Sequence, residues 1–127
     1  MTNVKTPRQR KSYPARHPPL EPAQLDAVAE LFSVLSEPTR LRILRRLQSG
    51  PASVGELVEE LMIKQANASK QLGILMSAGV VARRQQGNHA IFSIALPLVL
   101  ELCQLVCRGV ADHAAERAAA LEYRDGR

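Results

Sequence analysis

The spacing of apolar residues changes near Gly79, and this change limits the folds that the chain can adopt. Before Gly79 the apolar residues recur every three or four positions, which is the period of helices with one buried face. Residues 80–84 and 90–94 instead alternate as strands do, with a turn between them at 86–89, and helical spacing returns after Pro97. The chain is therefore predicted to be mainly α-helical with a small β-hairpin.

Capping and helix-ending residues set the predicted limits of the helices. The second helix is predicted to start at a capping Ser36 and to end before Gly50. Ser53 and Glu56 match a capping box at the start of the third helix, and residues 62–64 separate it from the fourth. The first, third, fourth and last predicted helices cover residues 23–34, 54–61, 65–78 and 97–121.

Composition narrows the class of protein. The 127 residues are enough for one compact domain, and 46% of them are hydrophobic. Aromatic residues make up only 3%, so the core must be aliphatic, which suits helices better than a β-sandwich. No apolar run approaches the roughly 18 residues of a membrane span, and two cysteines cannot form the disulfide framework of a secreted protein. We therefore expect a cytoplasmic protein with no membrane partner.

The chain divides into an arm, one domain and a short tail. Residues 1–22 contain five prolines and five basic residues, a composition typical of a disordered or extended arm. Residues 23–121 hold the helical and hairpin segments and form the predicted domain. Residues 122–127 are predicted to fray.

Positive charge is concentrated in the middle of the chain as well as in the arm. The net charge is +5, and residues 38–95 contain eight basic residues against three acidic ones. The remaining segments are acidic on balance. A basic stretch beside acidic flanks indicates a polyanionic partner, although a solvated surface of mixed charge would have the same composition.

A short helix, a three-residue turn and a helix with a polar face form a helix-turn-helix pattern, and a basic hairpin follows directly. Such a helix fits the major groove of double-stranded DNA, where amide side chains can pair with adenine edges and lysine can reach phosphates. On the hairpin, Arg83 and Arg84 are predicted to contact phosphates or a minor groove. The polar residues of the fourth helix are Gln65, Asn67, Ser69, Lys70 and Gln71.

The order of these motifs resembles the ArsR/SmtB-type family of repressors. The matching segments are LSEPTRLRIL at 35–44, VGEL at 54–57, SKQL at 69–72 and LMSAGVV at 75–81. The resemblance implies a winged helix-turn-helix homodimer that represses an operon and releases DNA when an inducer binds. By position, it adds Ala68 to the DNA-contacting residues and places the tip of the wing at Gly87 and Asn88.

Two positions depart from the family pattern. Met62 stands where the turn often has glycine, and Lys64 stands where the following helix often has a capping serine. These departures concern the turn and the helix start rather than the fold.

Two cysteines in the last predicted helix are candidates for inducer binding. Cys103 and Cys107 are four positions apart, so both sulfur atoms can share one helical face. Such a pair could hold a soft metal ion or arsenite, or form a disulfide or persulfide bridge. Small apolar packing residues would show the same spacing.

His113 and Glu116 match one half of a metal site that some relatives carry on this helix. Leu100 and Leu102 stand where the other half would supply ligands, and leucine cannot ligate a metal. A histidine at the helix surface or in an interface explains His113 equally well.

The last predicted helix is too apolar to be covered by one small domain. Together with the first helix it is predicted to form a homodimer interface. The dimer would place two DNA-binding helices roughly 34–36 Å apart, about one turn of DNA. This arrangement predicts a near-palindromic operator and an affinity that falls as salt rises.

Two other functions remain open. The winged helix could serve as a dimeric protein-interaction module without operator binding, or the chain could regulate transcription without a ligand. An enzyme is not expected, because the sequence has no glycine-rich phosphate loop, no zinc-ligand spacing and no evident nucleophile–base pair.

Overall fold

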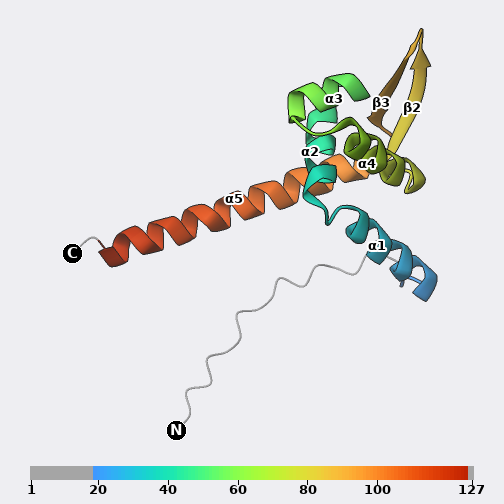
Figure 1. The fold of residues 1–127 in the computed structure, drawn as a ribbon. Helices are drawn as coiled ribbons and strands as arrows, with labels where there is room; N and C mark the ends of the chain where they lie inside the picture. Colours follow the sequence, from blue (N-terminus) through green and yellow to red (C-terminus); the bar gives the residue numbers. More distant parts are fainter. Residues whose placement is uncertain (1–18, 126–127) are drawn as a thin grey trace.

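The computed structural model describes residues 19–125, so most of the predicted arm at 1–22 lies outside the described part of the chain. Within it, a body of short helices and strands carries one long helix that extends away from it (Figure 1). The elements are α1 (Pro22–Val34), α2 (Pro38–Leu47), β1 (Ala52–Ser53), α3 (Val54–Leu61), α4 (Gln65–Ser77), β2 (Val81–Gln86), β3 (His89–Ile94) and α5 (Pro97–Asp125). This order confirms the mainly α-helical prediction with its hairpin, but α5 continues beyond the predicted end at residue 121.

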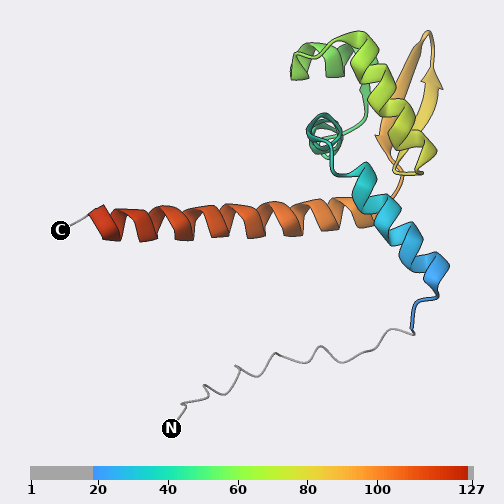
Figure 2. The ribbon, with the colours of Figure 1, turned by 60° about the horizontal axis from the view of Figure 1, so that its bottom comes forward.

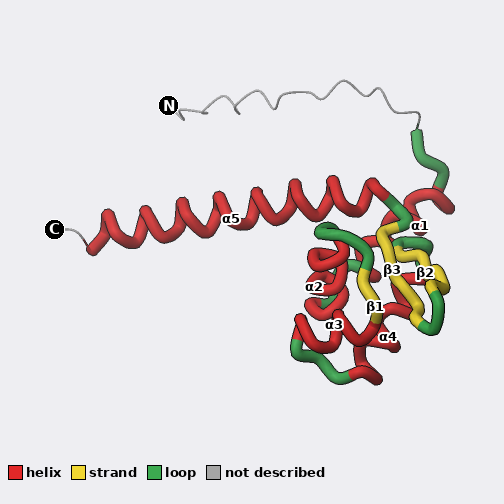
Figure 3. The backbone as a smooth tube through the Cα atoms, turned by 90° about the horizontal axis from the view of Figure 1, so that it is seen from above, coloured by secondary structure: helices red, strands yellow, loops and turns green. Residues whose placement is uncertain are grey.

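The three strands form one antiparallel sheet in the order β1-β3-β2 (Figure 3). β1 pairs Ala52 with Phe92 and was not predicted, because two residues carry no alternating pattern. Strands β2 and β3 are longer than predicted, so the turn contains only Gly87 and Asn88. Gly87 has φ +61°, as the first central residue of a type II′ hairpin turn requires.

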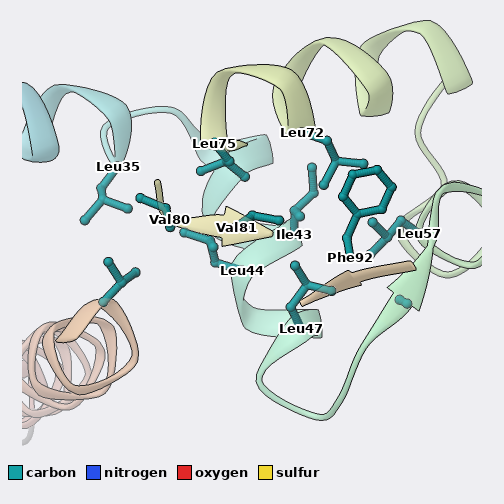
Figure 4. Close-up of a cluster of buried hydrophobic side chains, with 12 residues drawn as sticks. Leu35, Ile43, Leu44, Leu47, Leu57, Leu72, Leu75, Val80, Val81 and Phe92 are labelled. Atoms are coloured by element: carbon teal, nitrogen blue, oxygen red, sulfur yellow. The ribbon is translucent and has the colours of Figure 1, made fainter. Parts of the chain in front are cut away.

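The hydrophobic core lies between α2, α3, α4 and the sheet (Figure 4). Ile43 and Leu44 of α2 are at most 1% exposed. Ile43 lies beside Phe92 of β3, and Leu44 lies nearer Val80 and Val81. Burying a side chain of this size contributes about 1.5–3 kcal/mol to stability. The remaining members of the core are Leu35, Leu47, Ala52, Leu57, Leu72, Leu75, Val80, Val81 and Val99.

Helices α1 and α5 lie largely outside this core (Figures 1 and 2). No residue of α1 is buried, and Phe32 is 55% exposed. α5 is 29 residues long and exposes Leu105 and Val110 by 63% and 64%. Between residues 19 and 125, no helix is both long and apolar enough to cross a membrane.

The start of α2 differs from the prediction. The capping residue is Glu37, whose carboxylate accepts hydrogen bonds from the backbone N–H groups of Thr39 (3.1 Å) and Arg40 (3.0 Å). These backbone donors lower the pKa of Glu37, because they favour the charged carboxylate. Ser36, the predicted cap, instead donates from Oγ to the carbonyl oxygen of Ser33. An acidic side chain one position later therefore satisfies the first N–H groups of the helix.

The turn between α3 and α4 contains the only non-glycine residue with positive φ among residues 19–125. Met62 ends α3 with φ 55° and ψ 45°, in the left-handed region, and its side chain is 90% exposed. Lys64 precedes α4 and makes no side-chain capping bond. Both departures from the family pattern therefore leave a local cost in this turn.

Replacing Met62 with glycine is expected to stabilise the protein. The left-handed conformation costs an L-residue about 1–2 kcal/mol, and glycine avoids this cost. Glycine also loses more conformational entropy on folding, which costs roughly 0.5–1 kcal/mol. The net gain in the free energy of unfolding should be about 0.5–1 kcal/mol, measured by denaturant titration. Met62→Ala keeps the Cβ atom and should leave stability near the wild-type value. Equal effects of the two substitutions would contradict the argument.

Candidate nucleic-acid interface

The helix-turn-helix segment consists of α3, the turn and α4. Ser53 caps α3 by accepting from the backbone N–H of Glu56 at 3.2 Å, as the predicted capping box requires of the serine. α4 buries Leu72 and Leu75 in the core. This packing fixes which side of α4 is turned toward solvent.

The exposed side of α4 carries only part of the predicted DNA-contacting set. Gln65, Ser69 and Lys70 are exposed, and Asn67 is partly buried. Ala68 and Gln71 are 0% and 7% exposed, so the structure does not present them for contact with a bound molecule. The helical period explains the difference, because positions 68, 71, 72 and 75 share the side of the helix that faces the core.

Gln71 is held inside by two hydrogen bonds. Its Oε1 accepts from Arg40 Nε at 2.8 Å, and its Nε2 donates to Asn67 Oδ1 at 3.0 Å. Arg40 is also anchored by donation from Nη1 to the carbonyl oxygen of Val34 at 2.9 Å. Residue spacing could not reveal the role of Arg40, because its partner Gln71 lies 31 positions away.

Three of the four arginines of α2 make internal contacts. Besides Arg40, Arg42 donates to the carbonyl oxygen of Leu61 at 2.6 Å. Arg46 donates to the carbonyl oxygen of Gly50 and forms ion pairs with Glu60 and with Glu56. The hydrogen bond to Glu60 raises the pKa of Arg46. Three of the eight basic residues in 38–95 therefore link helices through hydrogen bonds or ion pairs.

The hairpin carries two exposed arginines on opposite sides. Arg83 pairs across the sheet with Phe92 and Arg84 with Ile91, so the two side chains leave opposite faces of β2. Arg83 Nη2 donates to Gln85 Oε1 at 3.3 Å. A single flat surface cannot be contacted equally by both arginines. Gly87 and Asn88 form the exposed tip.

A groove of about 540 Å³ separates α2 from α5. Cys103 and Cys107 both line it, so the structure places the predicted thiol pair on one face. Burial, and next the proximity of Cys107, raise the pKa of Cys103 and so disfavour its thiolate form. The other lining residues are Leu41, Arg42, Arg45, Gln48, Gln104 and Arg108.

The predicted half metal site gains no further ligands from the fold. Across the described residues, no three side chains of His, Cys, Asp or Glu are grouped closely enough to hold a metal ion. His113 and Glu116 both lie on the exposed part of α5. They therefore remain a pair of donors on a helix surface.

Comparison with known proteins places this geometry in a family. A helix-turn-helix domain family matches residues 35–84. The uncharacterised helix-turn-helix transcriptional regulator Rv0081 of Mycobacterium tuberculosis is 43% identical over 95 residues, which make up 74% of this chain and 83% of the relative. The crystal structure of Rv0081 matches with a TM-score of 0.69 and 40% identity, covering 78% of this chain and 99% of that chain.

Two further relatives carry more specific names. The probable mercury resistance operon repressor of Streptomyces lividans is 33% identical over 102 residues, which are 80% of this chain and 76% of the relative. The solution structure of the homodimeric winged helix-turn-helix domain of Mb0332 from Mycobacterium bovis, a possible ArsR-family regulator, has a TM-score of 0.64. Its sequence is 31% identical, and the match covers 76% of this chain and 91% of that chain.

The helix-turn-helix geometry, the hairpin that follows it and the similarity across most of the chain agree with the motifs identified in the sequence. The chain therefore belongs to the ArsR/SmtB-type family of winged helix-turn-helix transcriptional regulators.

Proposed function

We propose that a homodimer of this chain represses transcription by binding a near-palindromic operator in double-stranded DNA. In this proposal α4 is the recognition helix and lies in the major groove, while the hairpin β2–β3 contacts the flanking backbone or minor groove. The observation that carries the proposal is the exposed polar side of α4 beside an exposed basic hairpin. The function is regulatory rather than catalytic.

The exposed side chains have the chemistry that DNA requires. Gln65 and Ser69 on α4 can hydrogen-bond base edges or phosphates, and Lys70 can pair with a phosphate. Arg83 and Arg84, on opposite sides of the hairpin, can approach two different stretches of backbone. The proposed DNA contacts are therefore the exposed predicted residues of α4 and the hairpin, including the tip at Gly87 and Asn88. The buried Ala68 and Gln71 are not among them.

The exposed apolar residues of α1 and α5 support the dimer. Leu25 and Phe32 on α1, with Leu105 and Val106 on α5, are each at least 51% exposed in the single chain. Apolar surface of this extent is usually covered by a partner. The homodimeric form of the Mycobacterium bovis relative makes a second copy of this chain the favoured partner.

Removing two exposed charges from the proposed interface should weaken DNA binding. Lys70→Ala with Arg83→Ala is expected to reduce the slope of log affinity against log salt by roughly two units per protomer, if each side chain contacts one phosphate. The measurement is fluorescence anisotropy with an operator-containing duplex at several salt concentrations.

The matched control for charge is Arg45→Ala with Arg108→Ala, which removes two positive charges from the groove between α2 and α5. The control should change the slope much less. Equal slopes for both double variants and the wild type would remove Lys70 and Arg83 from the DNA contacts. Absence of duplex binding by the wild type even at low salt would favour a protein-interaction module that does not bind an operator.

A charge placed on the exposed apolar side of α5 should dissociate the dimer. Leu105→Glu is expected to shift the protein toward monomer in sedimentation velocity, because burying the new carboxylate in an interface would cost several kcal/mol. Gln104→Glu adds the same charge to the adjacent exposed residue and should leave the dimer intact. Dimers of equal strength in both variants would remove α5 from the interface.

We place the inducer response at the thiol pair. Arg42, Arg45 and Arg108 line the groove with Cys103 and Cys107, and their charges disfavour a divalent cation there. Arsenious acid is uncharged near neutral pH and reacts with thiols. Each thiol forms one As–S bond, and its proton leaves with one hydroxyl group as water. The groove therefore fits uncharged arsenite better than a divalent metal cation.

Replacing both cysteines with serine should preserve DNA binding and abolish the release of DNA by the inducer. Cys103→Ser with Cys107→Ser is expected to bind the operator like the wild type, because neither residue lies on α4 or the hairpin. Arsenite should release the wild type and not the variant, as followed by anisotropy, while high salt releases both. Equal release of both proteins by arsenite would exclude the thiol pair, and release of neither would favour a regulator without this ligand.

A further inference from the structure

We infer that Arg40, acting through Gln71, fixes the side-chain amide of Asn67 so that the recognition helix offers DNA an N–H donor and not a carbonyl oxygen. Arg40 and Gln71 are then positioning residues, and Asn67 determines specificity. The inference rests on the proposed function, because it concerns how α4 recognises a base.

The three side chains form one directional series of hydrogen bonds. Arg40 Nε donates to Gln71 Oε1 at 2.8 Å, and Gln71 Nε2 donates to Asn67 Oδ1 at 3.0 Å. Arg40 begins the series in a fixed position, because its Nη1 donates to the carbonyl oxygen of Val34 and its backbone N–H to Glu37.

The chemistry of arginine sets the direction of the whole series. A guanidinium group has five N–H donors and no acceptor, so the atom of Gln71 that faces Arg40 must be its oxygen. The amide nitrogen of Gln71 then faces Asn67, which must accept this hydrogen bond with its side-chain oxygen. Exchanging the positions of oxygen and nitrogen in either amide would put two N–H groups or two oxygens against each other. Gln71 is only 7% exposed, so water could not replace the lost hydrogen bonds.

The outward atom of Asn67 is therefore Nδ2. Within the described residues, Nδ2 has no protein partner, and no side-chain nitrogen or oxygen atom is both buried and without a partner. Nδ2 must accordingly be reachable by solvent. Asn67 sits in the first turn of α4, the part of a recognition helix whose residues contact base edges in helix-turn-helix complexes.

An outward N–H donor selects a base edge that accepts hydrogen bonds. In the major groove guanine presents two acceptors, N7 and O6, whereas cytosine presents only the N4 amino donor. The two-point contact between asparagine and adenine, expected from the residue type alone, also needs Oδ1 to face the base beside Nδ2, and here the hydrogen bond from Gln71 turns Oδ1 toward that buried side chain. We therefore assign to Asn67 one position in each half-site with guanine favoured and cytosine disfavoured.

The substitution Gln71→Glu tests the direction of the series with little change in shape. A carboxylate can still accept from Arg40 but cannot donate to Asn67, so Asn67 must turn over and donate Nδ2 inward. Its Oδ1 then faces the DNA and accepts from cytosine N4. The partner variant is Asn67→Ala, which removes the outward group and keeps a residue of high helix propensity.

The experiment selects preferred duplexes from a randomised library and measures affinities for single-base variants of the best site. For the wild type, one position per half-site should favour guanine over cytosine by about tenfold, which corresponds to roughly 1.4 kcal/mol. Gln71→Glu should reverse this preference at the same position. Asn67→Ala should abolish it there and preserve the preferences elsewhere.

Thermal unfolding and sedimentation of each variant verify that the fold and the assembly are retained. If the folded Gln71→Glu variant keeps the wild-type base preference at every position, or loses affinity equally for all sequences, the inference is wrong. If the wild type selects no sequence at all, the proposed function fails instead, so the two failures can be told apart.

Discussion

The burial of α2 is the packing constraint on which the rest of the structure depends. Its apolar side, with Ile43, Leu44 and Leu47, is enclosed by α3, α4 and β3. Among the described helices, α2 buries the most large aliphatic side chains in the core. The orientation of α4, and hence the choice of the residues that it exposes, follows from how its leucines pack against this helix.

The polar side of α2 has an equally structural role. Arg40, Arg42 and Arg46 reach the end of α1, the end of α3 and the interior of α4 through carbonyl, carboxylate and amide acceptors. Long side chains with several N–H donors suit this purpose, because one guanidinium can satisfy acceptors on more than one element. The basic residues of this segment therefore fall into two groups. The arginines of α2 that bond to internal acceptors hold the helices together, and the basic residues of α4 and the hairpin expose their charge.

The single chain leaves α1 and α5 with apolar surface that the domain does not cover. Each helix is well formed, yet α1 has no buried residue and α5 contacts the core mainly through its first turns. In the proposed function, this division separates two tasks in space, with base recognition on α4 and assembly on the terminal helices. The groove with its two thiols lies between α2 and α5. A ligand in this groove would therefore contact α2, the helix whose Arg40 holds Gln71.

Local pattern alone determined much of this protein: helix boundaries within a few residues, the serine cap of α3, the hairpin and the family, because periodicity and capping depend on neighbours in sequence. It misplaced the cap of α2 by one residue and missed β1, since neither has a distinct local pattern. Only the tertiary structure decided which polar residues of α4 face outward and which arginines are internal. The contact between Arg40 and Gln71 joins residues 31 positions apart, and such a pairing exists only once α2 and α4 have packed together.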